Sequence, residues 1–150
     1  MQSFFTPSST TTPSNQINSV TPDAISLRQL VSRLLNSFIP MAVTNSSLIV
    51  NDVRADVQVK ADEQTLAFVV GNLLTNAINS SKSVCIRVEA VKHSHGTEIR
   101  VRHNGASFHS TVAHSFLQAM EAARSLGGNI NIHNQRYEGT TITFYMRNEK

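Results

Sequence analysis

The 150-residue sequence has no tryptophan, one cysteine and few charged residues. Cys85 alone cannot form an intrachain disulfide or a thiolate metal cluster, and a single thiol fits a reducing cytoplasm. The net charge of +3 is too small to indicate a nucleic-acid-binding protein, because the basic residues do not cluster. Single basic residues on predicted strands instead indicate a solvated sheet edge: Lys82, Arg87, Lys92, Arg100 and Arg102.

Long apolar segments are also absent. The longest apolar run, Leu66 to Leu74, is interrupted by Gly71 and Asn72 and is too short to span a bilayer. The N-terminus has no basic stretch followed by an apolar one, so we expect no signal peptide. These absences predict a cytoplasmic protein that makes no membrane contact.

Residues 1–22 are rich in Ser, Thr, Pro, Asn and Gln. This composition buries too little apolar surface to offset chain entropy, so it predicts a disordered arm. The remaining residues, 23–150, are expected to form one domain, because the chain length is typical of a single domain.

The first predicted helix has Ser26 as its N-cap, with Gln29 completing a capping box. Its apolar residues recur at helical spacing as far as Phe38, and Pro40 is expected to end it. Strand patterns follow at 47–50 and around 57–59. Asp62 is the predicted cap of a second helix, from about Thr65 to Ser80.

Alternating patterns at 84–91 and through 99–101, around a turn at 93–96, predict a β-hairpin. A third helix is expected at about Ala113 to Leu126, ended by Gly127 and Gly128. A second hairpin with a turn at 136–139 closes the domain. This order predicts an α+β two-layer sandwich, with three helices on a mixed, mainly antiparallel sheet.

Three asparagines lie on one stripe of the predicted second helix: Asn72, Asn76 and Asn79. At about 100° per residue they fall within ~60° of one another. Asn is up to ~0.7 kcal/mol less favourable than Ala in a helix, so the three oppose helix formation by roughly 2 kcal/mol. Their amide groups suit contact with a metal-bound phosphate. A solvated polar edge, with one Asn bonded to a neighbouring loop, explains the pattern equally well.

The stretch 66–81, LAFVVGNLLTNAINSS, resembles the N box of the histidine-kinase-type ATPase domains, the fold shared by gyrase, Hsp90, histidine kinases and MutL. The flanks agree: 26–40 resembles the start of such a domain. Residues 122–146 resemble its end and match the family's glycine-and-threonine pattern at Gly127, Gly128, Gly139 and Thr140. The resemblance covers roughly Ser26 to Met146 and implies a Bergerat-like ATPase fold.

The resemblance also implies a nucleotide site. In that family the second Asn of the N box binds the magnesium ion that bridges the phosphates, a role that falls on Asn76, with Asn72 beside it. A Lys often follows three residues on, where this chain has the uncharged Asn79. Without magnesium, the Asn76 amide is expected to hold neighbouring backbone. The vestigial site implied by the resemblance consists of Asn72, Asn76, Asn79, His103, Asn104 and Gly105.

The sequence departs from the family at the box that should read Asp, any, Gly, any, Gly. The stretch 103–107 has His103 in place of the Asp that accepts a hydrogen bond from adenine, and Ser107 in place of the second Gly. A neutral imidazole can accept one such bond, whereas a protonated one can only donate. Loss of a buried polar partner weakens recognition strongly.

The lid is a further departure. Residues 108–112 lead almost directly into the last helix, with His109, Ser110 and Thr111 where a long lid would begin, and the chain has no Gly-rich phosphate cradle. We therefore expect weak or absent ATP binding, no catalytic residue and no cofactor, with ATP and magnesium bound only if the site functions. Nothing before Ser26 resembles the helices that carry the family's phosphoacceptor His.

These features predict a degenerate domain that acts as a signalling interaction module, with a histidine kinase or a response regulator as partner and a homodimer as a further option. The alternative is a functional ATP-binding catalytic domain of a sensor histidine kinase. Nucleic-acid binding has only the weak positive charge in its favour. A metal site at His93 and His95, or an anion or metal site at His103, His109 and His114, would need ligands brought together by the fold.

Overall fold

Two sheets and three helices make up the computed structural model, which describes residues 24–80, 82–104, 113–135 and 139–148, with only the backbone for 113–115. The elements in chain order are β1 (Ala24–Ser26), α1 (Leu27–Thr44), β2 (Leu48–Asn51), β3 (Gln58–Lys60), α2 (Glu63–Asn79), β4 (Cys85–Lys92), β5 (Gly96–His103), α3 (Ala113–Ser125), β6 (Gly128–Gln135) and β7 (Gly139–Arg147). The predicted arm, residues 1–22, lies outside the described residues. None of the described helices combines the length and apolar content that crossing a bilayer requires.

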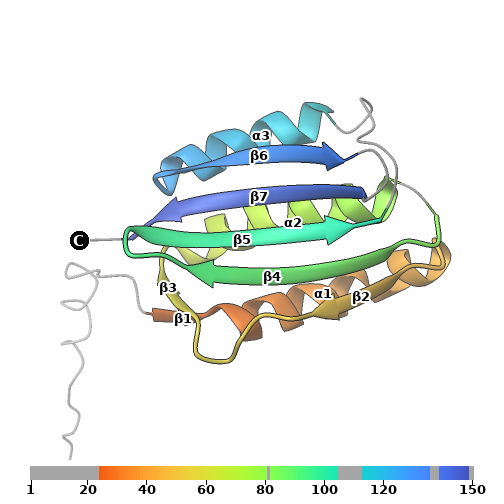
Figure 1. Ribbon diagram of the computed structural model, residues 1–150, viewed down its shortest axis with the longest axis horizontal. Coiled ribbons are helices and arrows are strands. Elements are labelled where there is room, and N and C mark those ends of the chain that lie inside the picture. Colours follow the sequence, from red (N-terminus) through yellow and green to blue (C-terminus); the bar gives the residue numbers. More distant parts are fainter. Residues whose placement is uncertain (1–23, 81, 105–112, 136–138, 149–150) are drawn as a thin grey trace, which may run out of the picture.

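The main sheet has the strand order β2-β4-β5-β7-β6, in which β2 runs parallel to β4 and all other neighbours are antiparallel. The three helices cover one face of this sheet (Figure 1). The predicted two-layer sandwich with a mixed, mainly antiparallel sheet is therefore confirmed. The second sheet pairs β1 with β3, and the sequence pattern had not indicated β1 as a strand.

The core lies between the helices and the sheet. α2 contributes the apolar arc predicted from its helical periodicity, and its members Leu66, Leu73 and Leu74 are fully buried. Alternate residues of β4, β5 and β7 face this arc, which explains the strict alternation in their sequences. The hydrophobic effect of this shared burial holds α2 against the middle of the sheet.

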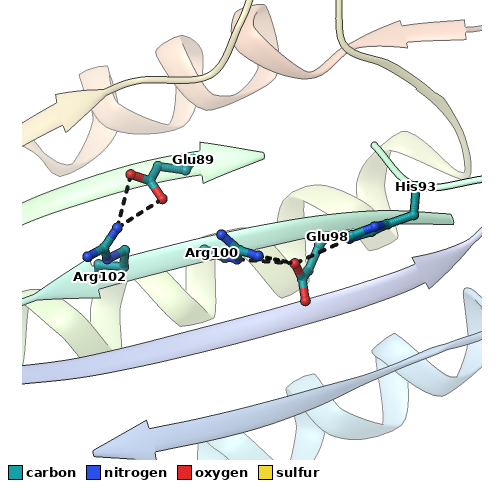
Figure 2. Close-up of polar contacts among 5 residues, drawn as sticks. All are labelled: Glu89, His93, Glu98, Arg100 and Arg102. Atoms are coloured by element: carbon teal, nitrogen blue, oxygen red, sulfur yellow. Dashed lines mark hydrogen bonds and ion pairs between the residues drawn. The ribbon is translucent and has the colours of Figure 1, made fainter. Parts of the chain in front are cut away.

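The other face of the sheet carries charged side chains. Figure 2 shows Arg102 beside Glu89, and Arg100 and His93 beside Glu98. These residues belong mostly to β4 and β5, which are interior strands. The prediction that the basic residues mark a sheet edge is therefore wrong for the four that lie on these strands, Arg87, Lys92, Arg100 and Arg102. A mixed sheet covered on one side only also leaves its interior strands one polar face.

Helix α1 does not end at Pro40, contrary to the prediction. It continues to Thr44, and Asn45 caps it by donating its backbone N–H to the Met41 carbonyl. Proline removes one backbone donor, but the following turn packs on the core: Ala42 is 5% exposed. Burial of Ala42 on one side of that turn therefore favours a helix that continues beyond the residue at which propensity alone would stop it.

Candidate functional site

Helix α2 begins where the sequence predicted its cap. The Asp62 carboxylate accepts hydrogen bonds from the backbone N–H and the hydroxyl of Thr65, at 3.0 and 2.6 Å. The side-chain bond and then the backbone bond lower the pKa of Asp62 below its ordinary value. The capped start and the buried apolar arc fix how α2 is rotated, and this rotation decides what surrounds each Asn.

The three asparagines of α2 lie in three different environments. Asn72 is half-buried, and its amide nitrogen donates to the Phe68 carbonyl of the same helix at 2.8 Å. Asn79 is exposed in the last turn. Asn76 is 4% exposed, although it shares the stripe. The stripe is therefore not the solvated polar edge that one interpretation of the sequence predicted.

The Asn76 side chain is buried with its amide nitrogen unsatisfied, because no described residue accepts a hydrogen bond from it. The expectation that this amide holds neighbouring backbone is therefore wrong for its nitrogen. A buried donor without a partner costs about 1–3 kcal/mol, so such a group in a native structure calls for an explanation. Rotating the amide by 180° would exchange the positions of its oxygen and nitrogen.

His103 ends β5 and lies beside the last turn of α2. It is 4% exposed, and the Ser80 Oγ atom lies 3.3 Å from its Nδ1 and 3.4 Å from its Nε2. The Ser80 hydroxyl also donates to the Ala77 carbonyl at 2.8 Å. Burial lowers the pKa of His103, which is therefore neutral at pH 7. Sequence reasoning missed Ser80, because only the fold brings it to a residue 23 positions away.

The strand ends around His103 pack backbone against backbone. The Asn104 Oδ1 atom accepts the Cys85 backbone N–H at 2.9 Å, which extends the pairing of β4 and β5 by one side-chain bond. Gly139 has φ +100°, and a Cβ there would lie 2.1 Å from the His103 carbonyl oxygen. The Gly139 and Thr140 pair therefore supports the end of β5, where Thr140 lies opposite His103. Gly105 lies outside the described residues.

A polar hollow of about 220 Å³ lies beside His103, with Asn104, Thr140 and Thr141 in its wall. Two arginines also line it, and both are already engaged: Arg87 pairs with Asp52, and Arg102 with Glu89. Sites for drug-sized molecules occupy roughly 300–1,000 Å³, so this hollow is small for a whole nucleotide.

The described residues fit magnesium and ATP only in part. Magnesium prefers oxygen ligands, and the stripe offers the amide oxygens of Asn72 and Asn76 but no carboxylate. Where the resemblance implies a carboxylate that holds adenine, the structure has a buried neutral imidazole packed on Ser80.

The histidine-based metal hypotheses gain no support. Among the described residues, no three His, Cys, Asp or Glu side chains form a group that could hold a metal ion. His93 instead lies 3.4 Å from Glu98, on the open face of the sheet (Figure 2). His109 lies outside the described residues, and for His114 the structure describes only the backbone.

The chain matches one family of known proteins. Residues 61–150 match the family described as histidine kinase-, DNA gyrase B- and HSP90-like ATPases. A search of curated proteins found no match.

Solved structures share the fold at low sequence identity. Histidine kinase AdeS of Acinetobacter baumannii is 14% identical with a TM-score of 0.74, over 90% of this chain and 72% of that one. The mycobacterial sensor histidine kinase MprB is 14% identical with a TM-score of 0.71, over 85% and 98%. Full-length ShkA in complex with AMPPNP is 13% identical with a TM-score of 0.76, over 86% and 32%. With the family match spanning more than half of its length, this chain belongs to the histidine kinase-, DNA gyrase B- and HSP90-like ATPase family.

Proposed function

We propose that this domain is a degenerate member of its family that binds ATP weakly or not at all and acts as an interaction module in signalling. The observation that carries the proposal is His103, buried and neutral against Ser80 at the position implied for the adenine-binding carboxylate. A site that has lost its fixed polar acceptor loses most of its discrimination for the matching ligand.

The phosphate side of the site supports the same proposal. β5 ends at His103 and α3 begins at Ala113, so only residues 104–112 join them. That connection leaves little sequence for both a lid and a second glycine-rich box. The neutral Asn79 also brings no charge to a phosphate group, whereas a cation there would strengthen the contact.

A second candidate function is ATP binding in a working catalytic domain. One observation favours it: the Asn76 amide, to which the resemblance assigns magnesium binding, is buried with its nitrogen unsatisfied among the described residues. Unpaired buried polar groups are costly and concentrate at functional sites. This candidate and the degenerate domain predict opposite results in one binding assay.

The decisive assay is titration of the chain with a fluorescent ATP analogue in the presence of magnesium, alongside Asn76→Ala. We expect no saturation below millimolar analogue, and the same curve for the variant. Micromolar affinity that disappears in Asn76→Ala would overturn the degenerate assignment and establish the catalytic one. Gln64→Ala is the matched control, because it removes an exposed amide from the first turn of the same helix, outside the site.

The interaction half of the proposal has its own test. Ile39 and Val43 lie one turn apart on α1 and are 53% and 69% exposed, which is unusual for large apolar side chains so close together. Purified histidine kinases and response regulators of the source organism would be screened for binding. We expect the double variant Ile39→Lys, Val43→Lys to bind its partner with at least tenfold lower affinity. Leu117→Lys on α3 should bind with the affinity of the unaltered chain. If no kinase or regulator binds the unaltered chain, the module assignment fails.

A further inference from the structure

A cavity of about 310 Å³ opens at the end of the main sheet opposite His103. β5 runs between the two places, since Thr97 near its start lines this cavity and His103 ends it at the polar hollow. The cavity lies along the seam between the two sheets, with β1 and β3 on one side and the ends of β4, β5 and β7 on the other. Figure 1 shows β1 and β3 at this end, close to where β7 finishes.

The cavity is lined by three cations, Lys60, Lys92 and Arg147, and by no carboxylate among the described residues. Lys60 and Arg147 make no side-chain hydrogen bond or ion pair with another described residue. This differs from the open face of the sheet, where Arg87, Arg100 and Arg102 each pair with a carboxylate. Positive charge at the seam is therefore left uncompensated by the described chain.

Backbone contacts hold these cations at the seam. The Lys92 ammonium donates to the Gln58 carbonyl at 3.0 Å, which bridges the two sheets and leaves two of its hydrogens for other acceptors. Arg147 pairs with Gly96 in the sheet register. The next residue, Asn148, donates from its backbone to the His95 carbonyl at 2.9 Å, and from its side chain to the Ser94 carbonyl at 3.2 Å. Bonds on both sides thus fix the backbone that carries Arg147.

We propose that this cavity binds a small molecule carrying a phosphate group, with Lys60, Lys92 and Arg147 as its charged contacts. Arginine presents a planar fork of donors that matches phosphate oxygens, and lysine adds compact positive charge. Ala24, Val59 and Met146 give the same cavity apolar wall, which suits the carbon part of a ligand. The site is separate from the nucleotide-like site at the other end of β5 and does not depend on ATP binding.

The test uses the full 150-residue chain, with pyrophosphate and inorganic phosphate as probes in calorimetric titrations at low salt. We expect saturable pyrophosphate binding that weakens at least tenfold in both Lys60→Gln and Arg147→Gln. Arg124→Gln on α3 and Arg54→Gln between β2 and β3 are matched controls, because each removes one cation outside the cavity. Backbone amide NMR shifts at Lys92 and Thr97 should follow the titration in the unaltered chain.

Two further outcomes decide the assignment. Absence of binding, or equal loss in the cavity variants and in the controls, would overturn the site and indicate general attraction of anions to a basic chain. Phosphatidylglycerol vesicles distinguish a lipid headgroup from a free phosphorylated molecule. Vesicle binding that depends on Lys60 and Arg147, without pyrophosphate binding, would replace the proposal with a membrane-surface contact.

Discussion

At the scale of single residues, the site is defined by two buried polar side chains, His103 and Asn76, that differ in their hydrogen-bond partners. His103 has the Ser80 oxygen beside its ring, whereas the Asn76 amide nitrogen has no acceptor among the described residues. His103 lies where the end of β5 meets the end of α2, and Asn76 lies one turn before that end of α2. Their burial makes each sensitive to changes that would be neutral on the surface.

The unsatisfied amide predicts a stabilising substitution. Asn76→Leu keeps the number and branching of the side-chain heavy atoms and removes the unpaired donor, so we expect the free energy of unfolding to rise by about 1 kcal/mol. Urea denaturation measures it. Asn104→Ala is the opposite control: its oxygen accepts the Cys85 N–H, and we expect a loss of about 1 kcal/mol. A loss in Asn76→Leu larger than in Asn104→Ala would contradict the predicted gain from removing the unpaired donor.

His103 predicts a pH dependence of stability. Burial lowers its folded-state pKa below the ordinary value of 6.5, so below that pH the unfolded chain binds more protons than the folded one. Stability from this group is therefore fully present above about pH 6.5 and declines as the pH falls towards the folded pKa. Denaturation midpoints between pH 5 and 8 should show this decline, and His103→Gln should reduce it. If the denaturation midpoint declines with falling pH just as steeply in His103→Gln, groups other than His103 cause the decline.

At the scale of elements, caps and close backbone contacts decide where strands and helices end. Ser26 and Asp62 cap α1 and α2 as their sequences predict. The start of β7 depends instead on a contact that no local pattern reveals, namely Gly139 lying against the backbone at the end of β5. This contact supports the strand end that carries His103.

Gly139→Ala should therefore disrupt the end of β5 as well as that of β7. The added Cβ would meet backbone at a positive φ, and we expect a loss of about 3 kcal/mol in unfolding free energy. Hydrogen exchange should show faster exchange at Arg102 and Thr141, which face each other across the two strands. Gly71→Ala is the control, because a Cβ there meets only the Phe38 ring at 3.8 Å. Similar losses in both variants would contradict the role given to Gly139.

At the scale of the whole molecule, the two ends of the main sheet differ in chemistry. One end has the buried His103 and a small polar hollow, and the other has a larger cavity with uncompensated cations. The helical layer covers only one face, which leaves paired charges on the other (Figure 2). A ligand bound at one end of the main sheet should therefore change the stability of the molecule differently from a ligand bound at the other end.

Nucleotide should stabilise this protein very little. A ligand bound only by the folded state adds RT ln(1 + [L]/Kd), which stays below ~0.4 kcal/mol when the concentration does not exceed Kd. With about 2 mM ATP and excess magnesium, we expect a melting-temperature shift under roughly 2 °C. Scanning fluorimetry measures it, with magnesium alone as reference. A shift that is large with ATP and lost in Asn76→Ala would favour the catalytic alternative.

The order of elements, the caps at Ser26 and Asp62 and the buried arc of α2 follow from the sequence, because periodicity and capping are local properties. The family also follows from it, through the motif around Asn76 and its flanks. Only the tertiary structure decided that Asn76 is buried without a partner for its nitrogen, that Ser80 meets His103, and that α1 continues through Pro40. These features depend on groups far apart in the chain, whose contacts are chosen by the packing of helices on the sheet and not by neighbouring residues.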